Sequence, residues 1–187
     1  MNGNAEPWSP GHILVTGGAG FIGANFVHWV ARHHPSTYLT VLDALTYAGK
    51  RASLAGVPAD RLTFVHADIC DETTLETLFS GRQTDVRGAE LPPIDAIVHF
   101  AAESHNDNAI DDPTPFLRTN VMGTYTLLQV ARRHDIRFHH ISTDEVYGDL
   151  PLGGVTRFTQ ASAYRPSNPY SASKASSDHL VRAWHRT

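Results

Sequence analysis

The stretch HILVTGGAGFIG, residues 12–23, decides the fold of this 187-residue chain. Its first half is a short apolar run that indicates a buried strand, and its second half is rich in glycine. The glycines satisfy both G-x-x-G-x-x-G, with Gly17, Gly20 and Gly23, and G-x-G-x-x-G, with Gly18, Gly20 and Gly23. Between a strand and a helix, such glycines allow a tight turn, close approach of the backbone to a pyrophosphate, and tight helix–strand packing. The stretch therefore predicts a dinucleotide-binding turn.

Further apolar runs alternate with segments of helical periodicity. After a helix from about 20 to 33, we expect strands at 38–43, 61–68, 94–102 and 136–143, and helices at 71–81, at 115–134 and from 169 onward. Segments 81–93 and 149–168 are expected to be loops. Continuous apolar strands separated by helices predict an α/β fold, a Rossmann-type doubly wound parallel sheet with helices on both faces.

The two ends of the chain suggest how it is organised. Residues 1–11 are polar and rich in Gly and Pro, and we expect a flexible leader there, followed by a dinucleotide-binding domain over 12–187. A full doubly wound sheet has about six strands, whereas the pattern here stops with the last helix. We interpret the chain as a fragment of a longer protein; otherwise another element must cover the open strand edge.

Composition excludes several classes of protein. The net charge of −4 offers no basic surface for nucleic acid. Cys70 is the single cysteine, which excludes an internal disulfide and favours the cytoplasm. No apolar run is long enough to cross a bilayer, so no membrane association is expected. The 12 histidines raise the question of a metal, but without an HExxH or paired CxxC motif we predict none.

Acidic residues follow the second and third predicted strands. Asp43 ends the second strand, about 20 residues after the glycine turn. A carboxylate there hydrogen-bonds the ribose diol and repels a 2′-phosphate, which favours NAD over NADP. Asp68, after the third strand, is in place either to reach the adenine edge or to cap the next turn, and both readings stay open.

Two groups of polar residues suggest catalysis. YSASK places Tyr170 and Lys174 four residues apart near a helix start, so they share a face. A nearby ammonium and a positive nicotinamide would stabilise the phenolate and let the pair take a proton from an alcohol. STDEVYG, residues 142–148, places Asp144 and Glu145 together at a strand end. Neighbouring carboxylates in a site of low dielectric acquire different pKa values, which provides one acid and one base.

Six motifs together resemble the extended short-chain dehydrogenase/reductase family, and within it the nucleotide-sugar dehydratases. They are the glycine turn, Asp43, AAESH (101–105), TNVMGTYTLL (119–128), STDEVYGD (142–149) and YSASK (170–174). The resemblance implies a homodimeric, NAD-dependent lyase that removes water from a nucleotide sugar. Tyr170 with Lys174 would take the C4 hydroxyl proton, and Thr143 would bind that hydroxyl. Glu145 would take the C5 proton, and Asp144 would protonate the departing C6 hydroxyl.

The same resemblance implies an NAD site. Its expected residues are Gly17, Gly20, Phe21, Ile22, Gly23, Asp43, Ala44, Leu45, Thr46, Asp68, Ile69, Ala101, Ala102, Ser104, Thr119, Tyr170 and Lys174. Ser104 and Thr143 are also expected to bind the sugar, and Asn120 to support the site structurally. SHNDNAI (104–110) differs from the SHVDRSI common in the family, with Asn106 and Asn108 in place of valine and arginine.

Alternative functions remain open at this point. A nucleotide-sugar 4-epimerase shares the fold, the NAD site and the Tyr/Lys pair, but does not need Asp144 and Glu145. A UDP-glucuronate decarboxylase would tolerate a glutamate at 145. A non-catalytic NAD-binding fragment is the alternative from another class. The resemblance also implies that the chain lacks a C-terminal substrate lobe, which would hold the residues that distinguish nucleotide bases.

Overall fold

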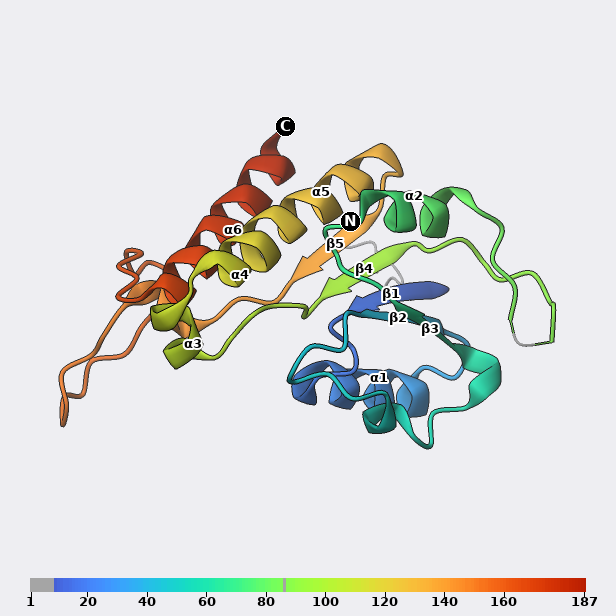
Figure 1. Ribbon diagram of the computed structural model, residues 1–187, viewed down its shortest axis with the longest axis horizontal. Coiled ribbons are helices and arrows are strands. Elements are labelled where there is room, and N and C mark those ends of the chain that lie inside the picture. Colours follow the sequence, from blue (N-terminus) through green and yellow to red (C-terminus); the bar gives the residue numbers. More distant parts are fainter. Residues whose placement is uncertain (1–8, 86) are drawn as a thin grey trace, which may run out of the picture.

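The structure is a computed structural model, and it describes residues 9–85 and 87–187. These residues form a parallel sheet in the order β3-β2-β1-β4-β5 (Figure 1). The strands are β1 (His12–Thr16), β2 (Tyr38–Asp43), β3 (Leu62–His66), β4 (Ala96–His99) and β5 (Arg137–His140). The predicted doubly wound α/β class is confirmed. Of the expected leader, residues 1–8 lie outside the described residues.

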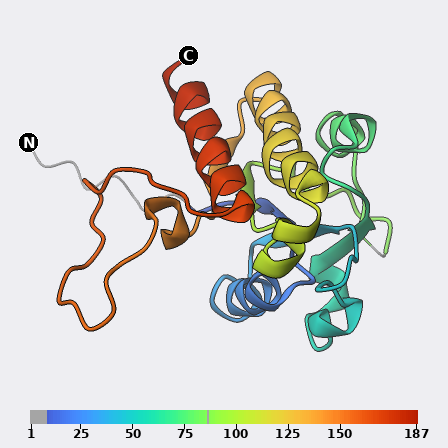
Figure 2. The same cartoon turned by 60° about the vertical axis from the view of Figure 1, so that its left-hand side comes forward.

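Helices cover both faces of the sheet. α1 (Phe21–His33) lies on one face, and α2 (Glu72–Ser80), α5 (Thr124–Arg133) and α6 (Pro169–Arg186) lie on the other (Figures 1 and 2). The segment between Tyr147 and Pro169 projects away from the sheet (Figure 2). No helix in the described part of the chain has the length and apolar character needed to cross a membrane.

The strands alternate their side chains between two apolar cores. Ile13 and Val15 of β1 pack with Val27 of α1, whereas Leu14 packs with Leu75 of α2 and Leu127 of α5. Because both faces of the sheet are covered, β1, β2 and β4 are buried along their whole length. This is why the central strands read as continuous apolar runs in the sequence.

The strand order creates a crevice beside β1. The chain runs outward from β1 to β2 and β3, then returns to place β4 on the other side of β1. The loops after β1 and β4 therefore leave in different directions, and ligands bind at such a switch point in open α/β sheets. Gly17 lies there with φ +68°, and a Cβ on it would lie 2.5 Å from the backbone nitrogen of Ala101. Glycine is required at this position.

Several local elements differ from the sequence prediction. The expected helix over 115–134 is divided into α4 (Thr114–Phe116), a π-helix, η3 (Leu117–Gly123), and α5. The last two expected strands are shorter, and 100–102 form a loop. The prediction missed α3 (Asn106–Asp111) and the 3₁₀ turns η1 (Arg51–Leu54), η2 (Ala59–Arg61) and η4 (Asp144–Tyr147). These elements are too short to produce a periodic apolar pattern.

Candidate active site

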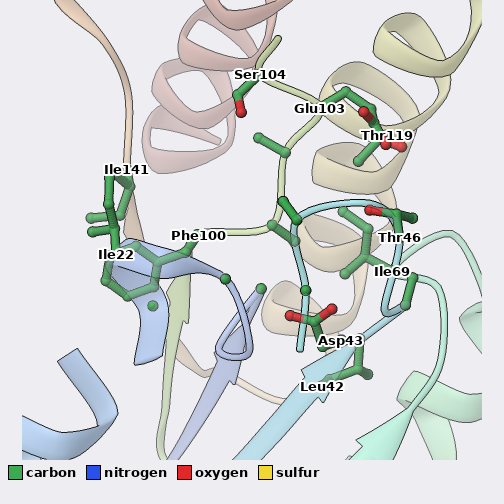
Figure 3. A pocket seen from close by; sticks show the side chains of 18 of the residues that line it. Ile22, Leu42, Asp43, Thr46, Ile69, Phe100, Glu103, Ser104, Thr119 and Ile141 are labelled. Atoms are coloured by element: carbon green, nitrogen blue, oxygen red, sulfur yellow. The ribbon is translucent and has the colours of Figure 1, made fainter. Parts of the chain in front are cut away.

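A cavity of about 370 Å³ opens at the carboxyl ends of β1, β2 and β4 (Figure 3). Its walls come from the glycine turn, the segments after β2, β3 and β4, the π-helix and the start of α6. The lining residues are Gly17, Gly20, Phe21, Ile22, Gly23, Leu42, Asp43, Ala44, Thr46, Ala48, Gly49, Ala67, Asp68, Ile69, Phe100, Ala101, Ala102, Glu103, Ser104, Thr119, Ile141, Ser142, Tyr170 and Lys174. All the expected cofactor residues except Leu45 are among them.

The glycine turn forms one wall of the cavity at the N-terminus of α1. A Cβ on Gly23 would collide with the carbonyl oxygen of Gly17, so the helix begins in direct contact with the strand end. Gly18 has a different role, because a Cβ there would lie 2.8 Å from Val41 in the core. Gly17, Gly20 and Gly23 thus shape the cavity, and Gly18 permits packing beneath it.

Asp43 lies at the end of β2 and is buried, with its carboxylate at the cavity wall (Figure 3). Its Oδ2 accepts a hydrogen bond from the Ala19 N–H at 2.9 Å, and its Oδ1 accepts one from the Leu45 N–H at 2.8 Å. The bond from Ala19 ties β2 to the glycine turn, and the bond from Leu45 fixes the start of the segment after β2. Each carboxylate oxygen has a second lone pair, so Asp43 can still accept hydrogen bonds from a vicinal diol.

Leu45 and Asp68 differ in how they contribute to the cavity. Leu45 does not line the cavity; it has a positive φ of 51°, and its N–H orients Asp43. Asp68 caps its turn by accepting from the Cys70 N–H at 2.9 Å and forms an ion pair with Arg118 at 2.9 Å, while also lining the cavity. Capping and an approach to the ligand are therefore both compatible with its position.

Asn120, on the π-helix, holds the loop after β4 against α6. Its Oδ1 accepts from the Glu103 N–H at 2.9 Å, and its Nδ2 donates to the Glu103 carbonyl at 2.9 Å and to Ser173 Oγ at 2.8 Å. Asn120 is fully enclosed, with 1% of its surface exposed. The side chain thus connects the loop that carries Ser104 to the helix that carries Tyr170.

Tyr170 and Lys174 lie on the first turns of α6, and both line the cavity. The Lys174 Nζ donates to the carbonyl of Ile141 at 2.7 Å. Burial lowers the pKa of Lys174 to about 8, and Asp178 acts in the opposite direction. Burial raises the pKa of Tyr170, and the charges of Glu145 and Asp144 raise it further, while a hydrogen bond with Thr143 lowers it. The described residues therefore keep Tyr170 a phenol.

The residues that follow β5 surround the same region. Thr143 is the N-cap of η4, and its Oγ1 accepts from the Glu145 N–H at 3.3 Å. Asp144 is exposed, and its side chain makes no hydrogen bond or ion pair with any residue that the structure describes. Thr143 and Asp144 line a second hollow, which shares Ser142 with the main cavity. Glu145 lines neither and is held by two asparagine amides, of Asn106 and Asn168.

Glu103 of the AAESH motif also lines the cavity, and burial raises the pKa of its carboxyl group. Sequence reasoning missed other parts of the lining. Phe100, Ile141 and Ser142 lie directly after β4 and β5, where the strand ends themselves were the available signal. Asn106 and Asn168 contact Glu145 from distant segments, and no sequence pattern indicated that contact.

The parallel sheet, the glycine turn at its switch point and the Tyr170/Lys174 pair define a Rossmann-type domain of the extended short-chain dehydrogenase/reductase class. More narrowly, the chain belongs to the family described as GDP-mannose 4,6-dehydratase, whose model matches residues 14–187.

Named relatives agree with this assignment. The chain is 57% identical over 175 residues to a dTDP-glucose 4,6-dehydratase of Mycobacterium tuberculosis, which covers 94% of this chain and 49% of the relative. A structure of the dTDP-glucose 4,6-dehydratase of Streptomyces venezuelae with NAD bound superposes with a TM-score of 0.81 at 48% identity, covering 94% of this chain and 52% of that one. A UDP-glucose 4-epimerase of Thermus thermophilus superposes with a TM-score of 0.77 at 28% identity, covering 94% and 51%.

The chain thus spans about half the length of the curated relatives it matches. That half contains the glycine turn, the cavity and the candidate catalytic side chains.

Proposed function

We propose that the cavity binds NAD. The residues present fit a dinucleotide on three grounds. The glycine turn leaves space where a Cβ would stand, α1 directs its N-terminus at the cavity, and Asp43 keeps free lone pairs at the end of β2. The Asp43 carboxylate disfavours a 2′-phosphate, so NAD is expected over NADP.

We further propose that the protein converts dTDP-glucose to dTDP-4-keto-6-deoxyglucose as an NAD-dependent hydro-lyase. The observation that carries this proposal is the placement of Thr143, Asp144 and Glu145 shortly after β5 and near Tyr170, whose pKa all three residues affect. An enzyme that only oxidises and reduces C4 needs Tyr170 and Lys174, but not an additional acid and base. Relatives named dTDP-glucose 4,6-dehydratase at 46–57% identity support the choice of substrate.

The proposed steps balance without an external oxidant. Tyr170 takes the proton of the C4 hydroxyl, whose oxygen is held by Thr143, while Ser104 contacts the sugar. Glu145 then takes the C5 proton, which the new C4 ketone has acidified. Asp144 gives a proton to the C6 hydroxyl, which leaves as water. When bound, NAD supplies the hydride acceptor for C4 and the hydride donor for C6. Glu145 returns its proton to C5 as C6 is reduced, and the proton taken by Tyr170 replaces that of Asp144 through solvent, so only water is lost overall.

The raised pKa of Tyr170 has a place in this scheme. A phenol with a raised pKa does not ionise on its own at neutral pH. The Lys174 ammonium and the positive ring of the oxidised cofactor both favour the phenolate. Tyr170 therefore becomes a base only when the cofactor is present in its oxidised form, which couples proton removal to cofactor binding.

Mass spectrometry of dTDP-glucose after incubation with the full-length protein and NAD tests the proposal. Loss of one water from the sugar nucleotide is expected, and an unchanged sugar would contradict it. The variants Asp144→Asn and Glu145→Gln separate the dehydratase from a 4-epimerase or a decarboxylase. If the protein is a dehydratase, each of the two variants should fail to release water from the sugar nucleotide while still oxidising C4.

We also propose that the protein works as a cytoplasmic homodimer. The exposed apolar side chains Leu117, Met122 and Tyr125 on η3 and α5 support the dimer, since large exposed apolar patches mark interfaces. The free thiol of Cys70 is compatible with a reducing compartment.

A further inference from the structure

Two asparagine amides hold the carboxylate of Glu145. The Asn106 Nδ2 donates to Glu145 Oε2 at 3.2 Å and more weakly to Oε1 at 3.5 Å. The Asn168 Nδ2 donates to Oε2 at 3.3 Å. The three residues come from the start of α3, from η4 and from the N-cap of α6, so the contact joins three separate segments.

The orientation of the Asn168 amide is determined by the helix that it caps. Its Oδ1 accepts from the Ser171 N–H at 2.7 Å, and Ser171 Oγ accepts from the Asn168 N–H at 3.1 Å, which completes a capping box. With the oxygen committed to the cap, only the Nδ2 group remains to face Glu145. Asn168 therefore places a donor, not an acceptor, beside the carboxylate.

The Asn106 amide is oriented by Glu145 itself. Its Oδ1 is buried without a partner among the residues that the structure describes. Exchanging the oxygen and nitrogen would aim the Oδ1 atom at the carboxylate, where the two acceptors would repel each other. Leaving the buried Oδ1 without a partner costs free energy. We infer that the hydrogen bond from Asn106 Nδ2 to Glu145 offsets this cost and stabilises the Asn106 conformation.

The helix that carries Asn106 also packs against Tyr170. Ala109 of α3 is fully buried in a cluster with Phe116 and Tyr170. One short helix thus contacts both the side chain proposed to act at C4 and the one proposed to act at C5. Asp144, by contrast, is exposed and has no hydrogen bond in the described part of the chain, so the two adjacent acids differ in their surroundings.

We propose that Asn106 is a positioning residue, which together with Asn168 holds the Glu145 carboxylate in the conformation that takes the C5 proton. The inference rests on the proposed dehydration. Neutral amides form weaker hydrogen bonds to a carboxylate than an arginine or lysine would, so they orient Glu145 while leaving an oxygen able to accept the proton.

Steady-state and single-turnover kinetics of full-length Asn106→Val and Asn168→Ser test this inference. Serine is a good N-cap, but it is too short to reach Glu145, so Asn168→Ser removes the donor and retains the helix cap. For each variant we expect kcat to fall about tenfold, less than the roughly 100-fold or more that a general base contributes, because one amide remains. KM for dTDP-glucose should stay within about twofold, since substrate contacts are unchanged.

Absorbance at 340 nm distinguishes positioning from general damage. If C5 proton removal alone is slowed, C4 oxidation continues and reduced nicotinamide accumulates during a single turnover. Asn108→Val, at an exposed position of the same helix, is the matched control and should behave as wild type.

The outcomes separate the two levels of the proposal. If the wild type removes water and both variants have the same kcat as wild type, the positioning role is overturned, but the proposed function is not. The positioning role is also overturned if kcat falls in the variants and reduced nicotinamide does not accumulate. Absence of water loss in the wild type would overturn the proposed function, and the positioning role with it.

Discussion

Lys174 shows how burial and a proposed catalytic role oppose each other at a single residue. It is 5% exposed, and burial lowers its pKa to about 8. A lysine in an unfolded chain titrates near 10.4, so between about pH 8 and 10.4 the unfolded chain binds more protons than the folded one. The free energy of unfolding therefore rises with pH across this window, and below pH 8 the folded protein bears the full cost of the buried ammonium.

Replacing Lys174 by methionine is expected to stabilise the fold at pH 7 while eliminating activity. Methionine fills a similar volume without a charge, and we expect the free energy of unfolding to increase by about 1–3 kcal/mol, partly offset by loss of the bond to Ile141. Urea unfolding at pH 7 and pH 9.5 measures this, and the variant should lack the rise between the two values. Lys50→Met, at an exposed position, is the control. A variant less stable than wild type at pH 7 would contradict the argument.

Asp43 is expected to decide which dinucleotide binds. In Asp43→Ser, the carboxylate that would bind the ribose diol and repel a 2′-phosphate is absent. We therefore expect the affinity for NAD to fall by at least about tenfold, and the ratio of NAD affinity to NADP affinity to decrease. Isothermal titration calorimetry with both cofactors measures the two affinities. Asp60→Ser, which alters a surface ion pair with Arg87, should change neither. Unchanged NAD affinity in Asp43→Ser would show that Asp43 serves only to tie β2 to the glycine turn.

Residues that are determined by local geometry could be predicted from the sequence, and residues that act across the fold could not. Gly17 and Asp43 follow apolar runs at positions where a strand end requires them, and the structure places both at the cavity. Asn106 and Asn168 became relevant only through their shared contact with Glu145, between segments 62 residues apart in sequence (168 − 106). Such a contact depends on tertiary packing and leaves no periodic signal.

At the scale of elements, the π-helix η3 is the feature with the largest consequence for the site. It interrupts the helical segment 114–133 at Leu117–Gly123 and turns Asn120 towards Glu103 and Ser173. π-helical turns are rare in proteins as a whole, but those that occur are often found at functional sites. Propensity and periodicity predicted a continuous α-helix here, because a π-helical turn widens the helix by one residue without changing which residue types it contains.

Gly123 ends the π-helix, and we expect that it permits the close contact with Ile69. A Cβ at Gly123 would lie 2.6 Å from Ile69 Cγ1, and Ile69 is buried at the cavity wall. Gly123→Ala is therefore expected to lower the free energy of unfolding by about 1–3 kcal/mol through overpacking. A double-mutant cycle with Ile69→Val, measured by urea unfolding, should recover part of the loss. If the two changes in the free energy of unfolding are additive, the strain in Gly123→Ala does not arise from contact with Ile69.

At the scale of the whole molecule, the site consists of contributions from both halves of the sheet. The β1–β2–β3 half provides the glycine turn and Asp43, and the β4–β5 half with α6 provides Ser104, Tyr170 and Lys174. Because the switch point lies between β1 and β4, the two sets meet in one crevice. The α/β alternation predicts a doubly wound parallel sheet, but the strand order that brings the two sets together is seen only in the structure.

The exposed apolar face of η3 and α5 makes a prediction about assembly. Leu117 and Met122 are 54% and 53% exposed and lie about one π-helical turn apart, with Tyr125 one turn further on. Covering such a patch releases water from apolar surface, and a second copy of the chain presents the same patch for a twofold-symmetric contact. We therefore expect the double variant Leu117→Glu, Met122→Glu to be monomeric, because a symmetric contact would bring the introduced carboxylates together.

Sedimentation equilibrium of the full-length protein distinguishes this face from others. Wild type should sediment as a dimer and the double variant as a monomer. Leu152→Glu is the matched control, since Leu152 is fully exposed in the segment between Tyr147 and Pro169, which projects away from the sheet (Figure 2). The cavity is formed within one chain, so the monomeric variant should still bind NAD, with an affinity within about threefold of wild type. A double variant that remains dimeric would assign the interface to another surface, and loss of NAD binding together with the dimer would mean that pairing supports the cavity.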